Sequence, residues 1–179
     1  KRLGQNPYVL GVIGSTDSPT ALSSTEEDNL HGKLATDSIP ANKNSGWNDD
    51  GPGATGWAMS ASGMAAIWAK SNTRSDIMDA LERREVYATT GPRIAVQFYG
   101  GTGFTAADLE NADVHAYATS RGVPMGGELS QPETPSFIVL TTKDPKGANL
   151  DRVQIVKGWL DEAGQAQENH HRHREQRST

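Results

Sequence analysis

The sequence predicts a mixed α+β fold. Three observations predict it: an apolar run at positions 8–13, a capped helical stretch that begins at Thr73, and a change to period-two alternation after Arg93. Unbroken apolar runs are typical of strands covered on both faces, a period near 3.6 is typical of helices, and alternation is typical of half-buried strands. The first half of the chain is therefore expected to differ in architecture from the second half.

The first expected element is a buried strand over 8–13, where Val and Ile residues are bounded by Asn6-Pro7 and by Ser15-Thr16-Asp17. A strand of this kind suits a parallel sheet, and α/β barrels place their chemistry where such strands end. Positions 23–56 are rich in Ser, Asn, Asp, Gly and Pro and are expected to form a loop. The small residues around Ser60–Gly63 are interpreted as part of a helix that packs closely under two tryptophans.

The clearest helix begins after Thr73. Its hydroxyl is placed to cap the first turn, with Asp76 three residues later in a capping-box position. The expected buried stripe consists of Ile77, Met78 and Leu81, with Ala80 beside it.

From Arg93 onward, short alternating stretches predict an antiparallel sheet or sandwich. After Ala166 the sequence holds no large apolar residue, so 166–179 is expected to be a polar His/Arg-rich tail. The predicted strands cover 94–99, 114–118, 137–142 and 152–157. The predicted domains are 1–91, 92–165 and the tail 166–179.

Charge and composition exclude several partners. The formal net charge of −5 disfavours a nucleic acid, because phosphate backbones are bound mainly by Lys and Arg. No stretch reaches the roughly 18 apolar residues of a membrane-spanning helix, and no signal-peptide pattern is present. A soluble protein without a membrane partner is expected, in a compartment that the sequence leaves open.

Four stretches carry a resemblance to a known family. Gly11–Asp17 (GVIGSTD) is similar to a late strand motif of PHP (polymerase and histidinol phosphatase) proteins. Positions 68–74, 84–93 and 143–159 resemble a bacterial branch of that superfamily, the domain of unknown function family 3604. The resemblance implies that this chain is the C-terminal portion of a longer protein. It implies a remnant of a PHP-type α/β barrel, one or two strands and helices, followed by a small antiparallel β-sheet or sandwich.

The resemblance also implies a function. PHP proteins are metal-dependent phosphoesterases or related hydrolases, with zinc, manganese or iron as the cofactor and a phosphate ester as the substrate. Their strand motif ends in a metal-binding Asp-x-His pair, which makes Asp17 the candidate ligand and puts Pro19 at the histidine position. Proline has no side-chain donor, so we expect the chain alone not to be catalytically competent. Two alternatives remain open: a non-catalytic β-rich binding or interaction module, and a partial reading frame without an independent role.

The remaining candidates are weighed against simpler roles. His31 lies among carboxylates and is a candidate substrate-binding residue, although a solvated charged segment also explains it. Arg93 is a candidate for binding a phosphate or carboxylate, with a turn-fixing ion pair as the alternative. The close histidines His170, His171 and His173 are interpreted as a loose tail rather than a rigid metal site. Because a truncated barrel exposes strand edges, self-association is expected.

Overall fold

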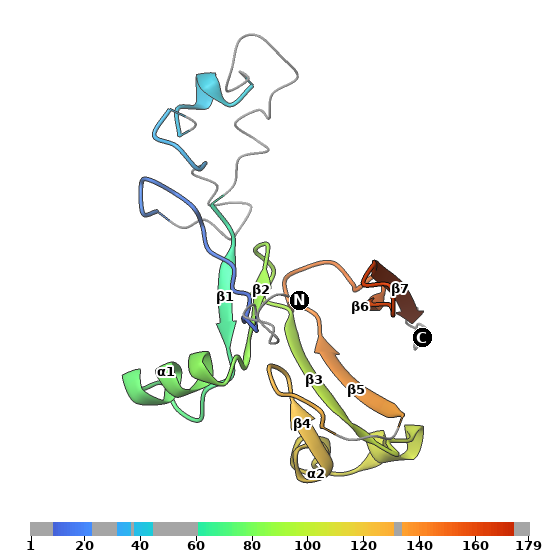
Figure 1. Cartoon of the computed structure of the whole chain (residues 1–179). Helices are drawn as coiled ribbons and strands as arrows, with labels where there is room; N and C mark the ends of the chain where they lie inside the picture. The colour runs from blue at the N-terminus through green and yellow to red at the C-terminus, as the bar shows by residue number, and fades with distance from the viewer. Residues whose placement is uncertain (1–8, 23–31, 37, 45–60, 131–133, 174–179) are drawn as a thin grey trace. The chain divides into compact units, whose positions relative to one another are not determined.

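The computed structural model describes residues 9–22, 32–36, 38–44, 61–130 and 134–173 (Figure 1). The fold is α+β, as predicted, with small antiparallel sheets and no closed barrel among the described residues. The chain divides into two compact units, Lys1–Thr142 and Lys143–Thr179. The boundary expected near position 91 therefore falls inside the first unit. Neither α-helix in the described ranges is long and apolar enough to cross a membrane.

The first strands of the first unit form a β-hairpin that carries a helix. Strand β1 (Met64–Ile67) pairs antiparallel with β2 (Val86–Thr89), and α1 (Arg74–Glu82) lies between them in the chain. The cap of α1 is confirmed, because the hydroxyl of Thr73 accepts a hydrogen bond from the backbone N–H of Asp76 at 3.2 Å.

Two expectations about this region are corrected. The helix expected around Ser60–Gly63 is absent from the described residues 61–63, which have no regular secondary structure, and β1 begins directly after them at Met64 with backbone bonds to β2. The expected buried stripe of α1 is also incomplete, since Ala80 is fully buried while Met78 is 50% exposed.

A three-stranded sheet forms the centre of the first unit. Its order is β4 (Gly122–Pro124), β3 (Ala95–Thr102), β5 (Pro135–Thr142), and both pairings are antiparallel. Helix α2 (Val114–Arg121) packs on it, and Tyr99, Ala118 and Ile138 form the buried cluster between them. The strands predicted at 94–99 and 137–142 are thus confirmed to within a few residues.

The strand expected at 114–118 is wrong, because these residues lie in α2. The carboxylate of Asp113 accepts a hydrogen bond from the N–H of Ala116 at 2.9 Å and caps the helix. Val114 and Ala118 then fall on one helical face and reach the buried cluster together. The short 3-10 helix η3 (Ala106–Glu110) precedes α2 and has its own capping box.

Side-chain hydrogen bonds tie the β1–β2 hairpin to the start of β3. The indole Nε1–H of Trp68 donates to the carbonyl of Val96 at 2.8 Å, and the hydroxyl of Tyr87 donates to the carbonyl of Ile94 at 3.0 Å. Both bonds end on backbone carbonyls at the start of β3, so they connect the hairpin to the three-stranded sheet within the first unit.

The apolar segment near the start of the chain is not the buried strand that its sequence predicts. Residues 9–13 have no strand partner, and the exposed fractions of Leu10 and Val12 are 74% and 70%. The segment runs beside β1 in Figure 1. Backbone packing there is close, since a Cβ on Gly14 would lie 2.5 Å from the carbonyl oxygen of Met64. The exposure follows because no other described element covers the outer side of this segment.

The second unit is a single hairpin of β6 (Val153–Leu160) and β7 (Ala166–His173). The strand expected at 152–157 is confirmed, but the polar tail expected from Ala166 is corrected: residues up to His173 pair with β6 along their whole length. Backbone pairing requires no apolar side chain, so a polar sequence opposite an apolar strand can complete a ladder.

The 3-10 helix η2 (Pro40–Asn42) belongs to the first unit and lies in the segment 23–56, which the sequence predicts to be a loop.

Candidate functional site

Asp17 lies just after the extended segment and directly before a turn, which the N–H of Ala21 closes by donating to the carbonyl of Ser18 at 3.1 Å. Its φ of 47° is in the left-handed region, which Asp tolerates better than most residues. The carboxylate is 82% exposed and forms an ion pair with the ammonium group of Lys33. Ser18 adds a second link, because its hydroxyl donates to the carbonyl of Lys33 at 2.9 Å. These contacts fix the turn.

The residues around Asp17 do not fit a metal centre. Lys33 already neutralises the carboxylate, and Pro19 has no donor atom at the position where the resemblance implies a histidine. No group of three or more His, Cys, Asp or Glu side chains able to hold a metal is found in the described residues. Zinc, manganese and iron sites need several imidazole or carboxylate ligands in a fixed geometry. Among the described residues no such set of ligands is gathered at Asp17.

The other predicted binding residues are Arg93 and His31. Arg93 lies exposed in the connection between β2 and β3, and His31 lies outside the described residues. His170 is in β7, where its ring contacts Glu168 on the same strand and Gln154 on β6. The histidines expected to form a loose tail are thus placed on a strand, with His170 in polar contacts.

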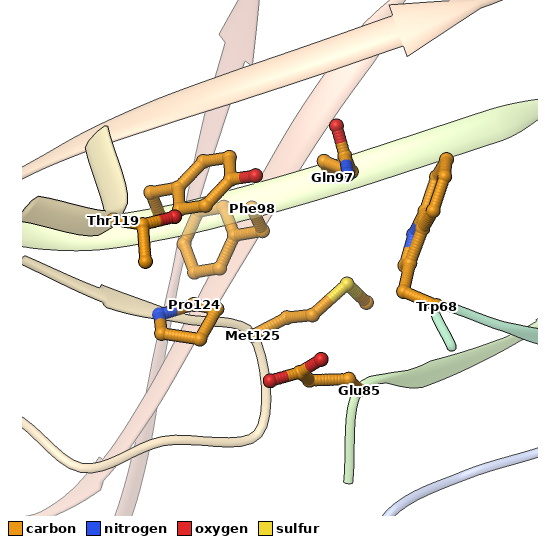
Figure 2. Close-up of a pocket in the computed structure, with 8 residues that line it drawn as sticks. Trp68, Glu85, Gln97, Phe98, Thr119, Pro124 and Met125 are labelled. Atoms are coloured by element: carbon orange, nitrogen blue, oxygen red, sulfur yellow. The ribbon is translucent and has the colours of Figure 1, made fainter. Parts of the chain in front are cut away.

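A cavity of about 160 Å³ lies in the first unit, at the end of β1 and against the sheet (Figure 2). Burial of Tyr99, whose ring also lines this cavity, raises the pKa of its hydroxyl. The cavity combines apolar and polar side chains, which is typical of small-molecule sites. The other lining residues are Trp68, Glu85, Gln97, Phe98, Thr119, Pro124 and Met125.

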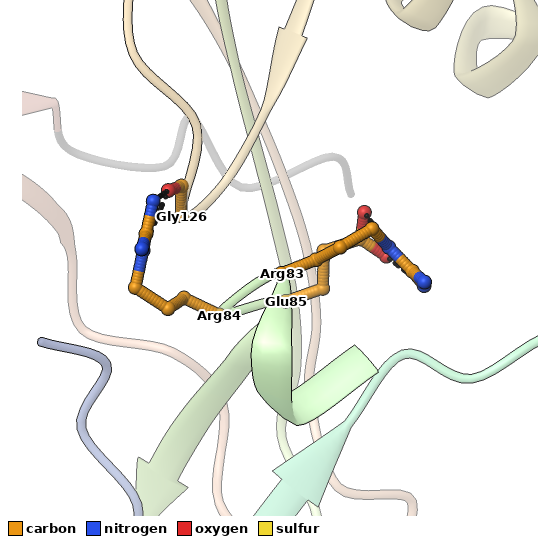
Figure 3. A network of polar contacts seen from close by, with 4 residues as sticks. All are labelled: Arg83, Arg84, Glu85 and Gly126. Atoms are coloured by element: carbon orange, nitrogen blue, oxygen red, sulfur yellow. Dashed lines mark hydrogen bonds and ion pairs between the residues drawn. The ribbon is translucent and has the colours of Figure 1, made fainter. Parts of the chain in front are cut away.

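The turn between α1 and β2 organises one wall of the cavity (Figure 3). Arg83 donates from Nε and Nη2 to the two carboxylate oxygens of Glu85 at 3.0 and 3.2 Å, and this contact raises the pKa of Arg83. The next residue, Arg84, donates from Nε and Nη2 to the carbonyl of Gly126 at 3.0 and 2.8 Å. The three consecutive residues thus present Glu85 to the cavity and fix the neighbouring loop.

Gly126 is required for this contact. Its φ is +83°, and a Cβ there would lie 2.5 Å from the carbonyl oxygens of Arg83 and Arg84. Only glycine adopts this conformation in so little space without strain. The close approach holds Met125, one residue earlier, at the edge of the cavity.

Sequence reasoning did not find this cavity. Trp68 and Glu85 lie in the stretches 68–74 and 84–93, which carry the family resemblance but predict no cavity, and Met125 lies in neither stretch. The local sequence signal is Glu85 itself, which follows Arg83 and Arg84 and directly precedes the strand that begins at Val86. Its position puts a carboxylate at the start of a strand. The lining residues come from the segment after β1, the turn before β2, strands β3 and β4, α2 and the residue after β4, and no local pattern predicts that these meet.

These features define an α+β chain of small antiparallel sheets, with a mixed cavity in its first unit and a single exposed carboxylate at the predicted metal position. The chain belongs to DUF3604, a family described as protein of unknown function, whose model matches residues 1–171. Comparison with curated proteins and with solved structures finds no match.

Proposed function

We propose that this chain is part of a bacterial PHP-like metal-dependent phosphoesterase, to which it contributes scaffold and at most one ligand. The observation that carries the proposal is the motif Gly11–Asp17, which resembles a PHP strand and lies inside the range matched by the family model. In the structure this motif is an extended segment that leads directly into the turn of Asp17. Most metal ligands would then come from outside this chain.

The exposed apolar side chains support the same proposal. Leu10, Val12 and Ile13 belong to a run typical of a strand covered on both faces, yet more than half of each is exposed. Exposed apolar clusters of this kind mark surfaces that other protein elements cover. A longer protein with further barrel strands beside this segment would provide that cover.

The first test is the metal content and activity of the purified chain. The chain is loaded in turn with zinc, manganese and iron, freed of excess metal, and assayed with p-nitrophenyl phosphate. We expect substoichiometric metal and no hydrolysis, both for the chain as it is and for the Pro19→His variant, because one histidine cannot replace a missing ligand set. One bound metal per chain together with hydrolysis would refute the scaffold role.

The second test is the coding DNA upstream of Lys1. The proposal expects an in-frame sequence with His-x-His and acidic motifs. When the chain is expressed together with that sequence, metal-dependent hydrolysis is expected, and Asp17→Asn is expected to lower it. Absence of such motifs would overturn the proposal and leave a β-rich binding module as the better description. The cavity at Trp68 and Glu85 is the observation that favours that alternative.

The exposed segment also predicts self-association, with a second copy of the chain as the occupant. Light scattering at micromolar concentration is expected to give a mass above that of one 19.2 kDa chain. Replacing Leu10 and Val12 together by Ser is expected to restore the monomer. Met78→Ser on α1, which removes another exposed apolar side chain, is the matched control and is expected to leave association unchanged. A monomer before any substitution contradicts this expectation.

A further inference from the structure

The charge inside the Trp68–Glu85 cavity is unusual, because Glu85 is the one charged side chain among its lining residues. Its side chain is only 19% exposed. A carboxylate that is mostly removed from water needs partners, since desolvation of an unpaired charge is costly. Arg83 supplies one such partner from the outer side, where it lines a neighbouring open hollow together with Lys70.

The hydrogen bonds from Arg83 do not occupy all the acceptor positions of the Glu85 carboxylate. It gives one hydrogen bond to each oxygen, whereas an ionised carboxylate accepts about four. Figure 2 shows the carboxyl group of Glu85 next to Met125, with the indole of Trp68 beside them. Acceptor positions on Glu85 thus remain available to a donor inside the cavity.

The apolar walls are held in place. The indole N–H of Trp68 is occupied by the carbonyl of Val96, so the π face of the ring is what it offers to a ligand. The loop that carries Met125 is fixed by the two bonds from Arg84 to Gly126. A site with fixed walls loses little entropy when a ligand binds.

We propose that this cavity binds a small organic cation, a primary or methylated amine with a short apolar group. The ammonium group donates charge-assisted hydrogen bonds to Glu85 and lies near the face of Trp68, which attracts cations through its quadrupole. The apolar group contacts Met125 and Pro124. An anionic ligand of the same size is repelled by Glu85. This site is independent of the proposed phosphoesterase role.

The test uses the whole chain and three probes of equal length: propylammonium, propionate and 1-propanol. Binding is followed by the ¹H–¹⁵N signal of the Trp68 indole, assigned with a Trp68→Phe variant. Propylammonium is expected to shift this signal saturably, while propionate has no effect and propanol binds more weakly. Tetramethylammonium separates the contribution of the hydrogen bonds to Glu85 from that of the cation–π contact with Trp68. It retains the cation–π contact and donates no hydrogen bond.

Charge variants distinguish a site that selects cations from a cavity that binds small molecules whatever their charge. Glu85→Gln is expected to weaken propylammonium binding about tenfold. Arg83→Gln removes the competing cation and is expected to strengthen it, a gain that a damaged fold does not produce. Lys146→Gln makes the same charge change in the second unit and is expected to alter nothing. No saturable shift with the amines, stronger binding of propionate, or equal affinity in the charge variants would overturn the proposal.

Discussion

The two β regions of this chain use the same pairing and differ in what covers them. Strands β3, β5, β6 and β7 are each eight residues long and pair antiparallel. In the first unit α2 packs on the sheet and buries Tyr99, Ala118 and Ile138, whereas the described side chains of the second unit are all exposed or half-buried. A complete backbone ladder therefore does not imply a core, and isolated two-stranded hairpins are marginal in water.

The largest expected effect comes from removing the same side chain in each region. Ile138→Ala in β5 empties part of the buried cluster and is expected to lower the free energy of unfolding by about 3 kcal/mol. Ile155→Ala in β6 is the matched control, and because Ile155 is only half-buried its cost is expected to be about 1 kcal/mol or less. Amide hydrogen exchange in β3 and β6 measures the two units separately. Equal losses would show that β6 has a core of its own.

A smaller destabilisation is expected from alanine substitutions at two strand glycines, one in each region. A Cβ on Gly122 in β4 would lie 2.2 Å from the carbonyl oxygen of Gly100, which is backbone and cannot rotate away. Gly122→Ala is therefore expected to destabilise the first unit by about 2 kcal/mol. A Cβ on Gly158 in β6 meets its nearest atom, the carbonyl oxygen of Gln167, at 4.0 Å. Gly158→Ala is expected to be neutral or to stabilise the hairpin by about 0.5 kcal/mol, because it restricts the unfolded chain.

Urea unfolding followed by circular dichroism checks this pair of glycines, with native spectra of both variants as the control. A loss at Gly158 as large as the loss at Gly122 would mean that the face of β6 around Gly158 is covered in solution.

The comparison also explains which elements the sequence predicts. The capped helix after Thr73 and the strands around 94–99, 137–142 and 152–157 were predicted correctly, because capping and alternation are local signals. The strand β7 was missed, since its polar residues show no hydrophobic pattern and its partner alone defines it. For 114–118, the cap from Asp113 and the contact of Ala118 with the buried cluster override a β-like composition.

The candidate sites also combine features that have a local sequence signal with features that depend on contacts between residues far apart in the sequence. The position of Asp17 after an extended apolar segment was predictable from the motif, but its ion pair with Lys33 joins residues far apart in sequence. The cavity at Trp68 and Glu85 requires both the Arg84–Gly126 contact and the register of β3 with β4. Neither contact has a local sequence signature, so the cavity emerges only from the folded chain.

The smallest expected effect concerns the loop of the second unit, which is held by polar contacts in place of a core. The carboxylate of Asp161 accepts hydrogen bonds from the backbone N–H of Gln165 at 2.8 Å and from the side chain of Gln167 at 2.9 Å. These bonds, the Gln165 bond foremost, hold the pKa of Asp161 below its ordinary value of 3.8. Their stabilising contribution is therefore complete above pH 3.8 and is lost as the pH falls through the lower pKa of the folded state.

Acidification is accordingly expected to loosen the β6–β7 turn while the covered sheet of the first unit keeps its protection. The backbone amide of Gln165, observed by NMR during an acid titration, is expected to lose its downfield shift, and its protection against exchange relative to the intrinsic rate at each pH is expected to fall. Asp161→Asn is expected to abolish this pH step, because its amide has no proton to gain in that range. Glu162→Gln removes the same charge one residue away, outside these hydrogen bonds, and is expected to leave the step intact. A step that persists in Asp161→Asn would assign the pH dependence to another group and show that the turn is held by its backbone alone.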